Sequence, residues 1–128
     1  MTRPALILFA HGARAVSWAA PFERLRDATA ARLPGTPVSL AFLELMEPRL
    51  PAEAARLAAS GVDSLSIVPV FLGQGGHLLR DLPLLVEELR AAHPGMAITV
   101  AGAVGEDPAV IEAMTNYCVQ AVGMSPLP

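Results

Sequence analysis

Two of the three histidines come shortly after apolar runs that are typical of buried strands. His11 directly follows residues 5–10 (ALILFA), and His77 lies beyond the run 64–71 and a glycine-rich segment. An imidazole is neutral in much of its population near pH 7, binds borderline divalent metals, and can accept or release a proton. The pair therefore indicates a metal site, an acid–base site or both; the alternative is that each ring only caps a loop.

Two imidazoles are too few for a closed structural zinc site, which usually has four protein ligands. They fit an open position from which a metal can exchange. The third histidine, His93, precedes Pro94-Gly95 at a predicted helix C-terminus, where the helix dipole favours a cation. We interpret it as structural.

A carboxylate and two arginines also lie near predicted strand ends. Glu44 follows the run 38–43 between apolar neighbours, where a carboxylate can serve as a proton acceptor; a solvated loop charge is the alternative. Arg14 and Arg80 each come three residues after a candidate histidine, so both can reach a negatively charged substrate unless they are plain surface charge.

Strand-like and helix-like segments alternate four times along the chain. The predicted strands are 5–10, 38–43, 64–71 and 96–101, and the predicted helices follow them, one after Ser17 that ends near residue 34 and the others at 51–60, 81–92 and 108–122. This order predicts an α/β fold: a single three-layer domain whose four-stranded parallel sheet is flanked by helices, in the flavodoxin-like order 2-1-3-4. Ligands of such sheets bind beyond the carboxyl ends of the strands, and that order brings His11 and His77 to one crevice.

Some details of these elements are less regular. Ser17 is the expected N-cap of the first helix, whose apolar residues Phe22, Leu25, Ala28 and Leu33 recur at helical spacing. Pro69 conflicts with a central strand and suggests a bulge or an edge position. Cys118 falls inside the last helix, where we expect it to be packed.

Length and composition set the remaining bounds. The 128 residues are 53% hydrophobic and 16% charged, which suits one domain, 1–123, with a frayed tail at 124–128. The formal charge of −3 argues against nucleic acid as a partner, and no apolar run approaches the roughly 20 residues that span a membrane. One cysteine and no secretion leader suggest the cytoplasm. Walker and Gly-x-Ser-x-Gly motifs are absent from the sequence, and residues 73–76 do not match a dinucleotide-binding fingerprint.

Three segments together resemble a known family. They are Leu8–Arg14 (LFAHGAR), Ala41–Glu44 (AFLE) with Pro48, and Val68–Pro83 (VPVFLGQGGHLLRDLP). The chain resembles the CbiX/SirB sirohydrochlorin chelatases in their short, single-domain form, and the third segment is the most specific. The first loop differs from the usual His-Gly-Ser-Arg-Asp-Pro of the family, because Ala13 replaces Ser and Ala15-Val16 replace Asp-Pro.

The resemblance implies a lyase that inserts a divalent metal into the tetrapyrrole sirohydrochlorin, in cobalamin or siroheme biosynthesis. The metal is a substrate, Co2+ first and Fe2+ or Ni2+ as alternatives, and no organic cofactor is implied. His11 and His77 match the metal-binding and catalytic histidines, and Glu44 an acidic pocket position. Arg14, Arg80, Gly75 and Gly76 are the candidate substrate contacts, and the short form works as a homodimer.

Two other functions fit parts of the sequence. A metal-carrying or metal-sensing domain would use His11 and His77 without turning over a tetrapyrrole. The histidine phosphatases also begin with a strand and His-Gly, but they need an arginine just before that histidine, where Ala10 stands here.

Overall fold

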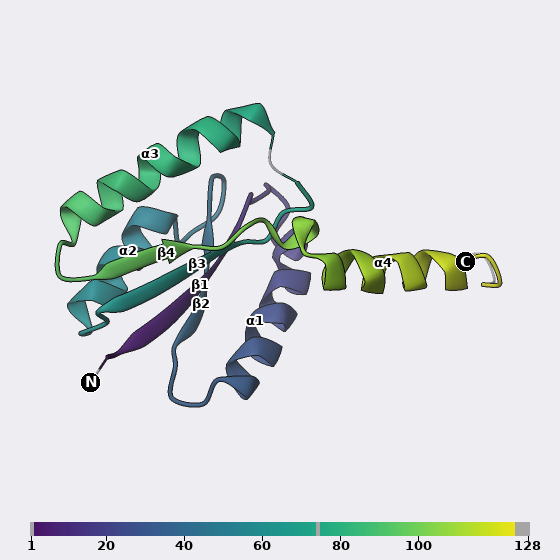
Figure 1. Cartoon of the computed structure of the whole chain (residues 1–128), viewed down its shortest axis with the longest axis horizontal. Helices are drawn as coiled ribbons and strands as arrows, with labels where there is room; N and C mark the ends of the chain where they lie inside the picture. The colour runs from purple at the N-terminus through teal and green to yellow at the C-terminus, as the bar shows by residue number, and fades with distance from the viewer. Residues whose placement is uncertain (1, 74, 125–128) are drawn as a thin grey trace.

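Strands and helices alternate through the whole of the computed structural model, which describes residues 2–73 and 75–124 (Figure 1). The elements in chain order are β1 (Pro4–Ala10), η1 (Val16–Ala19), α1 (Ala20–Arg32), β2 (Val38–Phe42), α2 (Leu50–Ala59), β3 (Ser64–Pro69), α3 (Gly76–Ala92), β4 (Ala97–Val100), η2 (Val104–Glu106) and α4 (Pro108–Ala121). The strands form one parallel sheet in the order β2-β1-β3-β4. The predicted fold class and strand order are confirmed.

The alternation of side chains along β1 supplies both halves of the core. Ile7 and Phe9 point to the face that α2 and α3 cover, where they pack with residues such as Leu57 and Val86. Leu8 points to the opposite face and packs in a smaller cluster with Phe22 of α1. Because α1 is joined to β1 and β2, its side of the sheet is filled mainly over those two strands.

Pro69 does not mark a bulge or an edge, so that prediction is wrong. β3 lies inside the sheet between β1 and β4, and Pro69 is its last residue, paired with Phe9 of β1. The amide of Val70 donates to the Phe9 carbonyl, so the residues of β3 next to Val70 direct their backbone groups toward β4. The Ala101 amide still donates to the Ile67 carbonyl over 2.9 Å, and the ladder between β3 and β4 ends at Pro69, where the next donor of β3 would stand.

The predicted starts of two helices also need correction. Ser17 does not cap α1: it lies in the turn η1, and Ala19 is the N-cap without a side-chain hydrogen bond. α3 begins at Gly76, five residues before the predicted start at Asp81, and it continues through Pro83. His77 therefore stands in the first turn of a helix and not in the loop before it.

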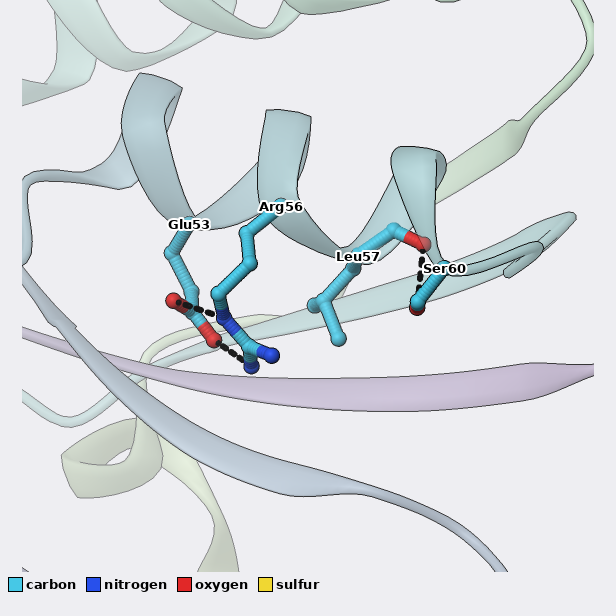
Figure 2. A network of polar contacts seen from close by, with 4 residues as sticks. All are labelled: Glu53, Arg56, Leu57 and Ser60. Carbon is cyan, nitrogen blue, oxygen red and sulfur yellow. Dashed lines mark hydrogen bonds and ion pairs between the residues drawn. The ribbon is translucent and has the colours of Figure 1, made fainter.

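An ion pair within α2 joins a buried carboxylate to an exposed arginine. Glu53 is only 4% exposed, and Arg56 Nε donates a hydrogen bond of 2.9 Å to its Oε1 while Nη2 donates to Oε2 (Figure 2). The bonds from Arg56 hold the pKa of the Glu53 carboxyl below its ordinary value, against the opposing effect of burial. Glu53 is thus charged when folded, and its charge is compensated on the same helix.

α4 extends away from the rest of the domain (Figure 1). Every residue of the helix except the partly covered Val110 is exposed, and so is Cys118, which corrects the prediction that this cysteine is packed. Of the predicted tail, only Met124 belongs to the described residues. Among the described residues, no helix is both long and apolar enough to cross a membrane.

Candidate functional site

Backbone hydrogen bonds tie the carboxyl ends of the strands into one edge. The amides of Leu43 and Glu44, just after β2, donate to the carbonyls of Ala10 and His11 over 2.9 Å and 3.0 Å. On the other side, the Gly105 amide in η2 donates to the carbonyl that follows β3, over 2.8 Å. The segments that follow all four strands therefore meet where an α/β sheet is expected to bind its ligand.

His11 stands in the middle of this edge, after β1. Its side chain is exposed, and its ring lies against Phe71, with 4.2 Å between ring centroids and 41° between ring planes. Phe71 is itself 5% exposed and packs edge-on against Phe9 in the core. The imidazole therefore has a firm apolar support on one side and solvent on the other, a setting that leaves its nitrogens available to a metal or a proton.

Gly12 allows the loop of His11 to lie directly against the loop of Glu44. Its φ is +94°, and a Cβ at this position would come within 1.8 Å of the Glu44 carbonyl oxygen. Only glycine accepts both the backbone conformation and the close approach. The side chains of Glu44 and of Arg14 are exposed at the same edge, so Glu44 is not enclosed by its apolar neighbours.

The remaining candidates belong to the start of α3. Gly75 is the N-cap, and Gly76 and His77 open the first turn, where unpaired amides give the helix end a partial positive charge. Arg80 is exposed one turn on, and its Nε donates to the Gly76 carbonyl at 3.3 Å. The side chain of His77 lies outside the described part of the chain, so the predicted pairing of His11 with His77 stays a prediction.

Sequence reasoning predicted which strands are neighbours but did not identify the residue that supports the His11 ring. The order β2-β1-β3 makes the ends of β1 and β3 neighbours, as the pairing of the two histidines required. Phe71 was expected only as the last residue of a strand, although it supports the His11 ring. In the described part of the chain, no group of three or more His, Cys, Asp or Glu is arranged to hold a metal.

The fold and this edge define a single-sheet, doubly wound α/β protein with its candidate site at the carboxyl ends of the strands. The family model CbiX matches residues 5–121, and the chain belongs to the CbiX family. The short-form resemblance in the sequence is confirmed by a solved CbiX protein from Marinobacter aquaeolei VT8. It shares 32% identity with a TM-score of 0.84, and the match covers 95% of this chain and 99% of that one.

Curated relatives carry the name sirohydrochlorin cobaltochelatase. The protein of Sulfurisphaera tokodaii is 33% identical over 59% of this chain and 59% of its own, and the match to that of Methanopyrus kandleri covers 57% of the relative. The chain thus matches less than two thirds of these two proteins. A relative from Sulfolobus acidocaldarius is 24% identical over 93% of both chains. SirB from Bacillus subtilis, 22% identical with a TM-score of 0.79, shares the fold over 98% of this chain and 49% of its own.

Proposed function

We propose that this protein is a sirohydrochlorin chelatase that inserts Co2+ or Fe2+ into the metal-free tetrapyrrole. The observation that carries the proposal is the exposed His11 ring, supported by Phe71 at the carboxyl edge of a CbiX-family sheet. The relatives named as cobaltochelatases favour Co2+, and Ni2+ is a further substrate to test. With one cysteine in the sequence, we assign the reaction to the cytoplasm.

The proposed reaction exchanges one divalent ion for two protons. His11 and His77 hold the incoming metal weakly, with water completing its shell, so that the ion can pass to the four ring nitrogens. Two of those nitrogens lose a proton as the metal enters, and the charge of the ring complex is thereby conserved. Glu44, or a histidine that is not holding metal, accepts these protons.

Positive groups at the same edge suit the carboxylates of the substrate. Arg14 and Arg80 are both exposed, and Gly75 and Gly76 lie at the amino end of α3, where backbone amides favour an anion. A single four-stranded sheet offers one wall to a broad, flat ring. We therefore propose a homodimer in which a second copy supplies the other wall.

The test is an anaerobic absorbance assay of the full chain with sirohydrochlorin and Co2+, Fe2+ or Ni2+ in turn. We expect the metal-free spectrum to disappear faster than without protein, and His11→Ala to reduce this acceleration at least about 100-fold without loss of fold. His93→Ala is the matched control, because His93 is the C-cap of α3. A folded protein that retains metal but does not accelerate insertion would instead be a metal carrier, and wild-type rates in His11→Ala would refute the site.

A further inference from the structure

Two exposed leucines stand at the edge of the sheet that carries His11. Among the described residues that precede α4, the large apolar residues that are more than half exposed are Val16, Leu45, Leu72 and Leu84. Leu84 lies on α3, and Val16 borders a hollow beside α1 and β2. Leu45 and Leu72 differ from these two, because they follow β2 and β3, the two neighbours of the strand that ends before His11. We call Leu45 and Leu72 the leucine pair.

The backbone at Leu45 has a conformation that leucine rarely adopts. Its φ is +67°, in the left-handed region where a Cβ crowds the following carbonyl oxygen. Other residues hold this loop in place: Leu43 packs in the larger core cluster, Met46 packs in the cluster beneath α1, and the Phe42 amide donates to the Pro48 carbonyl over 2.9 Å. The fold therefore gains little from the Leu45 side chain, which is attached to a strained backbone.

The same loop places Leu45 beside the loop of His11. The Glu44 amide donates to the His11 carbonyl over 3.0 Å, and the Glu44 carbonyl lies against Gly12. That carbonyl belongs to the peptide group that joins Glu44 to Leu45, so the backbone of Leu45 begins at this contact. Leu45 is thus fixed next to the loop that follows β1, although 54% of its surface is exposed.

Leu72 is fixed on the other side of His11. It follows Phe71, whose ring supports the His11 imidazole and whose carbonyl accepts from the Gly105 amide over 2.8 Å. Gly105 also lies so close to the backbone of Leu72 that a Cβ on Gly105 would overlap the Leu72 carbonyl. The backbone of Leu72 is therefore enclosed, whereas 71% of the surface of the residue is exposed.

We propose that the leucine pair contacts the apolar ring of the tetrapyrrole on either side of His11. The axes of β2 and β3 are two strand spacings apart, about 10 Å, which is close to the breadth of a tetrapyrrole ring. Sirohydrochlorin is amphipathic, because carboxylates surround a flat conjugated ring. The arginines and backbone amides proposed above suit the carboxylates, and the leucine pair offers the ring itself a surface that is stabilised when it is covered.

The strain at Leu45 has a role in this arrangement. Glycine and asparagine adopt the left-handed conformation more readily, but neither would present an apolar side chain at this position. A strained leucine beside His11 is explained if its side chain packs on the substrate and not on its own chain. The inference rests on the proposed chelatase function and identifies residues that determine the affinity for the ring.

The first test removes the apolar surface at each position. Leu45→Asn and Leu72→Asn introduce a polar side chain, and asparagine tolerates the positive φ of residue 45. Leu45→Met and Leu72→Met keep an apolar side chain of similar size and serve as rescue variants. Leu33→Asn is the matched control, because Leu33 is 40% exposed at the C-cap of α1, before β2 begins at the opposite end of the sheet.

Each variant is titrated anaerobically with metal-free sirohydrochlorin, and initial rates of insertion are then measured with Co2+. We expect the dissociation constant and KM to rise about 10-fold in each Asn variant of the leucine pair and about 100-fold in the double variant. Both Met variants and Leu33→Asn should stay within about twofold of wild type, and kcat should change less than KM, because the leucine pair neither holds the metal nor accepts protons. Wild-type affinity in both Asn variants would overturn the inference, and so would an equal loss in Leu33→Asn.

The second test separates contact with the ring from a role in folding. Leu45→Gly relieves the left-handed strain and removes the same apolar surface. We expect this variant to be at least as stable as wild type in urea denaturation, yet to bind metal-free sirohydrochlorin about 10-fold more weakly. A lower denaturation midpoint with unchanged affinity would mean that Leu45 serves the fold, and would overturn the inference.

Because binding and insertion are measured separately, failure of this inference differs from failure of the proposed function. Insertion by the wild type, with an affinity that neither Asn substitution alters, would leave the chelatase intact and refute the role of the leucine pair. Binding that depends on the leucine pair but is not followed by insertion would support the pair and refute the chelatase. A wild type that does not bind sirohydrochlorin would overturn both.

Discussion

Because Gly12 has no side chain, it allows the loops that carry the candidate residues His11 and Glu44 to lie against each other. The residue joins His11 to the rest of its loop, and its backbone passes directly under the Glu44 carbonyl. The two strand ends are thereby fixed at a separation that no larger residue permits. His11 and Glu44 thus depend on Gly12 for their relative position, although it contributes no chemical group.

Gly12→Ala should therefore lower the free energy of unfolding by more than the strain of a positive φ alone. Gly35 has a similar φ of +84° but no atom within 4 Å of an added Cβ, so Gly35→Ala is the matched control. We expect about 1 kcal/mol of lost unfolding free energy at Gly35 and about 2–4 kcal/mol at Gly12, where displacement of the Glu44 backbone adds to the conformational cost. Urea denaturation of both variants measures the difference. Equal losses would mean that the two loops separate freely.

Element starts and ends were harder to predict than the elements themselves. Four apolar runs sufficed to predict the strands, and the clearest is β1, which is apolar throughout and buried along most of its length. The start of α3 was missed since Gly75 and Gly76 have low helix propensity and were interpreted as loop. Pro69 was misjudged because a proline at the last residue of a strand ends the ladder on one side without moving the strand to the edge of the sheet.

The ion pair on α2 gives this element a specific pH dependence. The folded pKa of Glu53 is lowered, chiefly by the hydrogen bonds from Arg56, so its stabilising contribution is fully present above the unfolded pKa near 4.5. The contribution is lost as the pH falls through the lower folded pKa, because the unfolded state then binds more protons.

Glu53→Gln should therefore destabilise the protein most near neutral pH. Since the Arg56 side chain is 61% exposed, no buried charge is stranded, and we expect a loss of about 1–2 kcal/mol at pH 7 that shrinks below pH 4. Glu87→Gln is the control, because Glu87 pairs with Arg90 at the same i,i+3 spacing but is 69% exposed, and it should cost under about 0.5 kcal/mol. Denaturation from pH 3 to pH 7 compares the two; a loss at Glu53 that does not vary with pH would contradict the linkage.

At the scale of the whole molecule, the sequence predicted one domain but not the direction of its last helix. Local pattern indicates that residues 108–122 are helical and amphipathic, and the structure has α4 over Pro108–Ala121. The side on which a helix packs depends on the connection before it, here the contact of Gly105 with Leu72. The same reasoning explains Cys118: a pattern that shows an apolar side does not show whether the rest of the domain covers it.

If the substrate ring needs a wall from each copy, the rate of metal insertion should depend on the concentration of the dimer and not on the total concentration of chains. The specific activity of the wild type should then be constant above the dissociation constant of the dimer and fall on dilution below it. Initial rates of insertion over a wide concentration range measure this, with mass determined in parallel. Full specific activity at dilutions where the measured mass is that of one chain would mean that one carboxyl edge suffices for insertion.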